Sequence, residues 1–276
     1  MSRLAAAFAD RDGPVFVGFL VAGDPDPAMS LAVAKTMIDA GAGILEVAIP
    51  FSDPMADGPI IQQAHERALA AGMTPDAAFD LVQAIRGYAP VPVVLFTYAN
   101  IVFRQGWERF AARAAGAGAD ALLVVDLPPE ESGDLAAAAA RHGLDLIRLI
   151  APTTSAARRL IRLIAPTTSA ARRRRVLAGA SGFVYLVAVE GVTGVRDDLP
   201  AYLADLIRTV RQETRLPLAV GFGVSRPGHV QAIAAAGADA VVVGSAITRI
   251  IGEHPDGGTK MLQAVGDYVA AMVGRP

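Results

Sequence analysis

Short runs of apolar residues recur along the chain, and most of them are followed by a longer segment with helical character. The runs cover residues 15–21, 44–49, 91–97, 121–125, 146–150, 183–189, 218–220 and 240–243. Thr74-Pro75 is a helix start signal for residues 74–88, and Gly143 is a stop signal after residues 129–142. Continuous Val, Ile and Leu strands that alternate with helices indicate a parallel sheet with helices packed outside it.

Eight such strand and helix units within 276 residues favour a closed barrel over an open sheet. We therefore predict an α/β protein with a single (β/α)8 TIM barrel domain over residues 1–276 and an N-terminal helix over residues 2–9. In this fold the active site lies at the carboxyl ends of the strands. The residues that follow each strand should therefore gather on one face.

One segment occurs twice without a change. Residues 146–159 read LIRLIAPTTSAARR, and residues 160–173 repeat the same letters, which is a tandem duplication of the strand-5/helix-5 segment. Only one copy can fill a strand position if eight strands close the barrel. We predict that residues 146–150 take that position, because they follow Gly143 by a short connection.

The second copy should have a different structure from the first. Its apolar residues continue a helical stripe that begins near Ser155, and Pro166 should end that helix. Residues 166–180 should then form an extra excursion on the N-terminal face, away from the active site. We expect the arginine run of residues 172–175 to be a solvated helix face.

Composition and charge exclude several classes of function. The formal net charge of -2 makes no case for a nucleic-acid partner, and the absence of cysteine excludes disulfides and thiolate metal sites. No apolar run is long enough to span a bilayer, and the N-terminus breaks into charges before a signal-peptide core could form. We expect a cytoplasmic protein that binds neither nucleic acid nor membrane. We expect no metal site, because the histidines lack ligand spacing and should lie at helix surfaces or ends: His65, His142, His229 and His254.

Residues 45–59, LEVAIPFSDPMADGP, place carboxylates in and after one strand. A carboxylate in an apolar strand is costly unless it is paired or used. A structural ion pair would explain Glu46 alone, but Asp53 and Asp57 follow at the end of the same strand and favour a functional role. Desolvation should raise the pKa of Glu46 toward the working pH, whereas Asp57 in a wetter loop should stay ionised. Such a pair can transfer protons and hold a developing positive charge.

Glycines at the ends of the last strands suggest a phosphate site. Gly223 and Gly244 each precede a helix start, and Gly194 lies in the loop after the sixth strand. Backbone N–H groups at helix N-termini bind anions, and phosphate sites recur at these two places in TIM barrels. Each glycine alone is explained by a turn, but their combination favours a phosphate-bearing substrate.

These motifs resemble those of the tryptophan synthase alpha chain family. The segment LEVAIPFSDPMADGP is specific to that family, and similar blocks follow in family order over nearly the whole chain, among them AGDP, TYAN, DLP, GFVY, GVTG, VGFG and GSA. The resemblance implies a carbon–carbon lyase that cleaves indole-3-glycerol phosphate to indole and glyceraldehyde 3-phosphate by a retro-aldol reaction, in tryptophan and thus aromatic amino-acid biosynthesis. It further implies an alpha2beta2 heterotetramer in which indole passes to a beta chain. Pyridoxal phosphate is expected in that beta chain, with no cofactor in this one.

The resemblance also implies roles for individual residues. Glu46 matches the general acid/base and Asp57 the partner of the indole N–H. Thr193 matches a loop residue that meets the catalytic aspartate on closure. The other implied substrate contacts are Phe19 and Tyr185 around the indole and Gly194, Gly223, Gly244 and Ser245 around the phosphate. Asp53, Asn100 and Pro128 match positions that face the beta chain.

Two other readings remain open at this point. A different phosphate-binding barrel enzyme, such as a sugar-phosphate isomerase relative, often needs a lysine in a strand, but the chain has only Lys35 and Lys260, neither in a predicted strand. A catalytically weakened barrel, altered by the duplication and acting mainly as an activating subunit of the beta chain, is the second. Indole release from indole-3-glycerol phosphate, with and without a beta chain, separates these readings.

Overall fold

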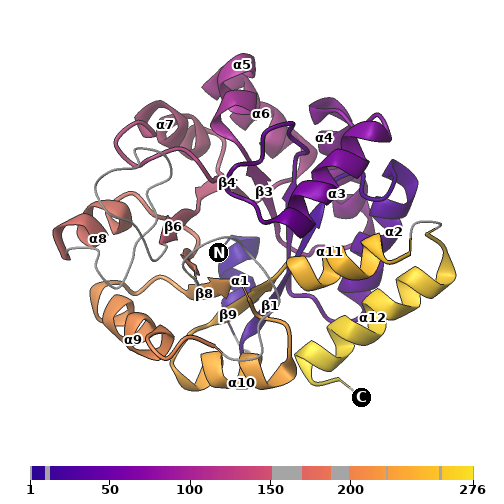
Figure 1. Cartoon of the computed structure of the whole chain (residues 1–276). Coiled ribbons are helices and arrows are strands. Elements are labelled where there is room, and N and C mark those ends of the chain that lie inside the picture. Colours follow the sequence, from indigo (N-terminus) through magenta and orange to yellow (C-terminus); the bar gives the residue numbers. More distant parts are fainter. Residues whose placement is uncertain are drawn as a thin grey trace.

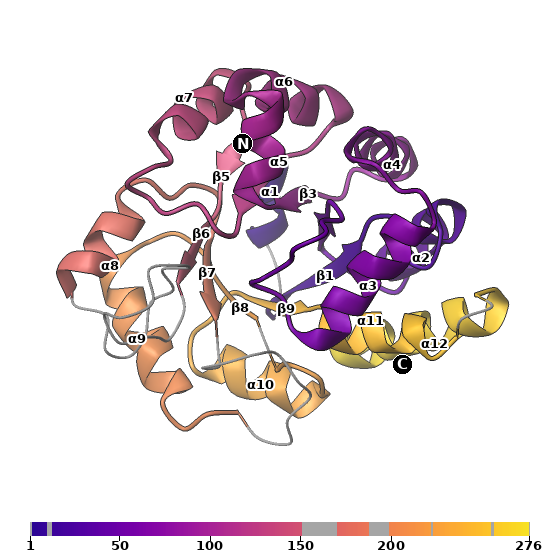
Figure 2. The same cartoon turned by 45° about the horizontal axis from the view of Figure 1, so that its top comes forward.

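The computed structural model describes residues 2–9, 13–150, 170–187, 199–221, 223–254 and 257–275. In these residues a parallel sheet curves into a nearly closed barrel, with helices forming a ring outside it (Figure 1). Figure 2 shows the same ring tilted, with α2, α3 and α4 on the right and α8 and α9 on the left. The predicted α/β barrel is therefore confirmed. No helix in the described ranges is long and apolar enough to cross a membrane.

The described residues form nine strand segments, which occupy eight positions in the barrel. Their order in the sheet is β5-β4-β3-β2-β1-β9-β8-β7-β6, and each neighbouring pair is parallel. β5 pairs with β4 and β6 pairs with β7, so these two segments on either side of Ile147 fill one position between them. The strands are β1 Val15–Val21, β2 Ile44–Ala48, β3 Val93–Thr97, β4 Ala121–Val124, β5 Asp145–Leu146, β6 Arg148–Ile150, β7 Val184–Val187, β8 Leu218–Gly221 and β9 Ala240–Val243.

The helices follow the start and stop signals of the sequence at several ends. Thr74 accepts a hydrogen bond from the Ala77 N–H at the start of α4, and Asp26 caps α2 in the same way through Ala28 and Met29. The helices are α1 Arg3–Phe8, α2 Pro27–Asp39, α3 Pro59–Ala70, α4 Pro75–Tyr88, α5 Ala99–Gln105, α6 Trp107–Ala117, α7 Gly133–Arg141, α8 Ala170–Leu177, α9 Leu203–Glu213, α10 Pro227–Ala235, α11 Ser245–Gly252 and α12 Thr259–Val273.

Some helices differ from the predicted ones. α5 is a separate helix that the sequence pattern misses, and α7 begins at Gly133 rather than at residue 129. Gly116 is the expected stop signal of α6, but the helix continues to Ala117 and is capped by Gly118. Gly118 adopts φ +95°, a left-handed conformation that favours glycine, whereas Gly116 continues the helix. The residue with the left-handed backbone therefore ends the helix.

The N-terminal helix covers the amino end of the barrel. In α1, Leu4 is fully buried, and Arg3 pairs with Asp120 directly before β4 at 2.7 Å. The Phe8 ring lies 5.9 Å from that of Phe183, which directly precedes β7. α1 thus seals the end opposite the carboxyl ends of the strands.

The first copy of the repeat fills the barrel position, as predicted. Its residues form Leu146 of β5 and all of β6, and both segments pair with their neighbours. The excursion onto the N-terminal face expected for residues 166–180 is wrong for residues 170–177, which form α8 in the outer ring beside β6 (Figure 1). Residues 166–169 lie outside the described residues. The helix expected to begin near Ser155 lies outside the described residues.

Ion pairs and burial explain why α8 belongs to the ring. The Arg173 guanidinium contacts Glu213 of α9 at 2.5–2.9 Å, and Val176 is buried. Arg175 lies 3.5 Å from Glu130. Arg174 and Arg175 are exposed, as expected for a solvated face, whereas Arg173 is held against α9. The buried Arg148 of β6 donates to the carbonyl of Gly179 just beyond α8, where a helix C-terminus favours a cation.

Candidate active site

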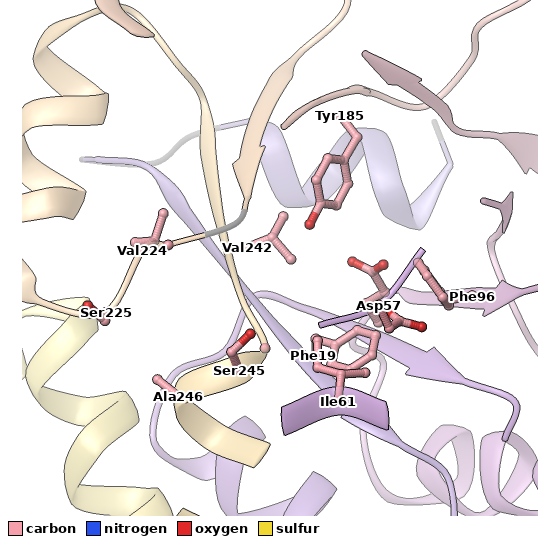
Figure 3. A pocket seen from close by; sticks show the side chains of 13 residues that line it. Phe19, Asp57, Ile61, Phe96, Tyr185, Val224, Ser225, Val242, Ser245 and Ala246 are labelled. Carbon is pink, nitrogen blue, oxygen red and sulfur yellow. The ribbon is translucent and has the colours of Figure 1, made fainter. Parts of the chain in front are cut away.

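A pocket opens at the carboxyl ends of the strands and collects the two carboxylates that the sequence singles out. Glu46 of β2 and Asp57 of the following loop both line it, together with the phosphate-type segments after β8 and β9. Figure 3 shows Asp57, Phe19, Phe96 and Tyr185 around one side of this hollow and Ser225, Ser245 and Ala246 around the other. One end is therefore apolar and acidic, and the other is rich in backbone N–H groups.

Glu46 lies in an otherwise apolar strand with every residue buried. Its side chain is 1% exposed, and its Oε2 has no hydrogen-bond partner within the described ranges. Burial away from water, and secondarily the neighbouring charge of Asp57, raise the pKa of Glu46 to about 8. The carboxyl is therefore mostly protonated at neutral pH and can give a proton to a substrate.

Asp57 is held by a second set of side chains below the pocket. The Tyr98 hydroxyl donates to Asp57 Oδ2 at 2.6 Å, and His65 Nε2 lies 3.3 Å from the same oxygen. Asp57 is only 2% exposed, so the wetter setting expected from its place in a loop is wrong. α3 begins directly after Asp57 and folds the loop back over the barrel. The carboxylate therefore lines the pocket in a position set by these neighbouring side chains.

Aromatic side chains form the apolar wall. Phe19 is the register partner of Glu46 and points to the same side of the sheet, and its ring meets that of Phe96 edge-on at 5.6 Å. Tyr185 lines the same pocket, and burial raises the pKa of its hydroxyl well above the usual value. A flat aromatic ligand placed on this wall would lie beside both carboxylates.

The opposite wall consists of the start of α11 and the loop between β8 and α10. Gly244 caps α11, whose first residues Ser245 and Ala246 face the pocket, and Gly223 has a left-handed φ of +83°. The first N–H groups of a helix have no partner within it and are suited to an anion. Tyr268 donates to the carbonyl of Ser225 at 3.1 Å and secures the loop after β8. This wall fits a phosphate group.

Replacement of Gly244 by alanine is expected to raise KM with little change in the fold. An added Cβ would lie 2.9 Å from Cδ1 of Phe19, so either the ring or the start of α11 must shift. Loss of one hydrogen bond from the helix start to the charged phosphate would cost about 1.5–3 kcal/mol, which corresponds to a roughly 10–100-fold weaker substrate interaction. Steady-state kinetics would measure the effect, with Gly228→Ala as the control, because the Gly228 site has open space around it. An unchanged KM in the Gly244→Ala variant would contradict the assigned wall.

The structure does not bring every predicted site residue to this pocket. Asp53 and Asn100 line a separate hollow on the same face, and Pro128 lines another beside Arg148. Thr193 and Gly194 lie outside the described residues. No cluster of His, Asp or Glu that could hold a metal ion occurs among the described residues.

His65 is a site residue that the sequence analysis missed. It is fully buried on α3, although a surface or helix-end place was expected. The signal was present in the sequence, because Ile61, Ala64, His65 and Ala68 follow helical spacing and form the buried stripe of α3. His229 is also buried, and its Nδ1 accepts from the Ser225 N–H at 3.3 Å.

Comparison with known proteins agrees with this geometry. The model of the family described as "Tryptophan synthase alpha chain" matches residues 5–160 and 159–273, and the two matches meet at the junction of the repeated copies. The tryptophan synthase alpha chain of Methanoregula boonei is 44% identical over 272 residues, which cover 99% of this chain and 97% of the relative. That of Methanothermobacter thermautotrophicus is 43% identical over 268 residues, covering 97% and 94%.

A solved structure shows the same architecture. The tryptophan synthase a2b2 complex of Pyrococcus furiosus contains a chain with a TM-score of 0.83 and 37% identity to this chain, covering 94% of this chain and 98% of that one. The match in sequence and fold extends over nearly the entire length of both proteins. The chain therefore belongs to the tryptophan synthase alpha chain family.

Proposed function

We propose that this chain cleaves indole-3-glycerol phosphate to indole and glyceraldehyde 3-phosphate, with Glu46 as the proton-transfer group and Asp57 as the partner of the indole nitrogen. Family membership makes the chain a lyase of tryptophan biosynthesis. The apolar wall with Phe19 suits the indole ring, and the wall with Gly244 suits the phosphate. The glycerol carbons would then lie between the two walls.

The proton on Glu46 begins the reaction. It passes to C3 of the indole ring, and the ring nitrogen becomes positively charged. The Glu46 carboxylate then takes the proton of the glycerol hydroxyl next to the bond that breaks. The electrons of that carbon–carbon bond return to the ring, the hydroxyl carbon becomes the aldehyde, and Glu46 is protonated again. One carboxyl of raised pKa can serve both steps.

Asp57 stabilises the charge that develops on the ring nitrogen. Its carboxylate accepts a hydrogen bond from the indole N–H. The attraction between the carboxylate and the positive ring nitrogen is strong because the site is largely shielded from water. Contacts between the substrate phosphate and the backbone N–H groups of the opposite wall contribute binding and orientation, and take no part in the bond-breaking step. The roles of the two carboxylates differ because one is desolvated without a hydrogen-bond donor, and the other is held by Tyr98.

The observation that carries this proposal is the burial of the Glu46 carboxyl, whose Oε2 has no hydrogen-bond partner among the described residues, beside Asp57 in the pocket between the two walls. Its test is indole formation from indole-3-glycerol phosphate by the purified chain, alone and with a beta chain. We expect measurable release by the chain alone and faster release in the complex. A chain that releases no indole in either case, yet increases the turnover of the beta chain, would instead support the reading as an activating subunit.

The pH dependence of kcat/KM should follow Glu46. Since the reaction begins with protonated Glu46, kcat/KM is expected to fall above its pKa of about 8. The pH profile of kcat/KM, which reports the ionisation of the substrate-free enzyme, would be recorded from about pH 7 to about pH 9.5. The Gly228→Ala variant should keep the same descending limb. A profile that stays flat over this range would contradict the assignment of Glu46 as the initial acid.

The partner of this chain is proposed to be a tryptophan synthase beta chain in an alpha2beta2 complex, as in the structure from Pyrococcus furiosus. Asp53 and Asn100 line a hollow on the active-site face, and Met55 and Phe103 nearby in sequence are 78% and 70% exposed. Exposed apolar side chains on one face are typical of an interface. Pyridoxal phosphate belongs to that partner in this proposal, and the location is cytoplasmic.

A further inference from the structure

His65 forms an internal link between the loop after β2 and the catalytic carboxylate. It lies on the second turn of α3, its side chain is 1% exposed, and both ring nitrogens face this loop. Nδ1 lies 3.1 Å from the backbone N of Phe51, and Nε2 lies 3.3 Å from Asp57 Oδ2. The imidazole thus contacts the start and the end of the loop that carries Asp57.

The Phe51 contact determines which ring nitrogen carries the proton. A backbone N–H can only donate, so Nδ1 must accept and cannot hold a proton itself. The neutral imidazole therefore has its proton on Nε2, the nitrogen beside Asp57. Within the described residues Nε2 has no well-aligned partner, and Asp57 Oδ2 is the acceptor within reach. Long contacts of this kind in substrate-free enzymes often tighten in the substrate complex.

One oxygen of Asp57 accepts a hydrogen bond from Tyr98 and has His65 Nε2 within reach. The Tyr98 hydroxyl donates to Oδ2 at 2.6 Å and itself accepts from the Ala56 N–H at 3.2 Å. With His65 Nε2 at 3.3 Å from the same atom, Oδ2 faces its protein neighbours rather than the pocket. Oδ1 has no donor among the described residues, and Asp57 lines the pocket, so Oδ1 is the oxygen left for a substrate N–H.

We propose that His65 is a positioning residue that acts as a neutral Nε2–H donor, set in that tautomer by the Phe51 N–H, and holds Asp57 with Oδ1 directed at the substrate nitrogen. This inference rests on the proposed role of Asp57. A misplacement of about 1 Å in a catalytic group can cost on the order of 10²-fold in rate. Loss of the donor should therefore lower kcat more than it changes KM, because the phosphate wall supplies binding separately.

The test compares two substitutions of similar length and volume. His65→Gln keeps an N–H donor near the position of Nε2, whereas His65→Met removes it. We expect kcat for indole formation to fall about 10–100-fold in His65→Met and less than about threefold in His65→Gln, with KM within about threefold in both. Glu66→Gln, an exposed change on the same helix, is the control and should leave kcat unaltered. Equal kcat values in the two variants would overturn the proposal.

A second comparison uses the Asp57→Asn background. If His65 acts through Asp57, His65→Met should cause little further loss there, whereas an independent structural role would lower kcat again by the same factor. Activity retained in Asp57→Asn itself would overturn the proposed role of Asp57, and the His65 proposal with it. An inactive Asp57→Asn together with a fully active His65→Met would overturn the His65 proposal alone.

A measurement on the unaltered protein covers the case in which the variants fail to fold. Nitrogen NMR distinguishes a protonated from an unprotonated imidazole nitrogen. We expect a single proton, on Nε2 of His65, at neutral pH. A proton on Nδ1, alone or together with one on Nε2, would contradict the tautomer on which the proposal depends.

Discussion

Replacement of Glu46 by glutamine is expected to lower kcat for indole formation by roughly 10²–10⁴-fold. Glutamine has nearly the same shape and can still be buried, but it has no acidic proton to give to C3 and cannot take one from the glycerol hydroxyl. Substrate binding should be largely kept, because the phosphate wall and Phe19 are unchanged. The loss should therefore appear in kcat, with KM close to that of the unaltered chain.

The same substitution should stabilise the folded protein by an amount that increases with pH. The folded-state pKa of Glu46 is raised from 4.5 to about 8, so the unaltered chain loses stability as the pH rises between these values. Glu46→Gln has no such loss and should be the more stable protein by up to about 4–5 kcal/mol above pH 8. Urea unfolding at several pH values would measure this difference. A Glu46→Gln variant with near-normal turnover would refute the catalytic assignment.

Leu146→Asp is expected to destabilise the barrel by about 4–5 kcal/mol or more, enough to unfold a domain of ordinary stability. Leu146 is 5% exposed and pairs with Leu122 across β5 and β4, so the new carboxylate would be buried without a charged partner. Leu160→Asp changes the same letter in the second copy and should destabilise the protein less than Leu146→Asp. Leu146 is the better site for this pair than Leu149, which is only half-buried.

Circular dichroism during urea unfolding would compare the two leucine variants directly. A larger loss in Leu160→Asp than in Leu146→Asp would show that the second copy fills the strand position in solution. Deletion of residues 160–173 offers an independent control. Because the two copies are identical, deleting either one leaves the same sequence, with a single copy for the strand position. The shortened chain should fold and gain roughly 1 kcal/mol from the shorter connection between β6 and α8.

Much of the site could be predicted because topology gathers the ends of parallel strands. Glu46 and Asp57 are near in sequence, but Tyr185, Gly223 and Gly244 join them only because every strand points the same way. The periodicity of the strands and the helix caps carried this information. His65 was missed because its role depends on the path of the loop from Phe51 to Asp57, which hydrophobic periodicity does not describe.

The sequence by itself determined the order of strands and helices and which residues follow each strand, because local apolar patterns and turn residues encode both. Tertiary structure decided the rest. Burial, rather than residue type, raises the pKa of Glu46, and the backbone of Phe51 selects the tautomer of His65. The repeat is the clearest case, because two copies with identical letters cannot by themselves say which one enters the sheet. The short connection from Gly143 places the first copy in the strand position. The contacts of Arg173 and Val176 place the end of the second copy at the start of a helix.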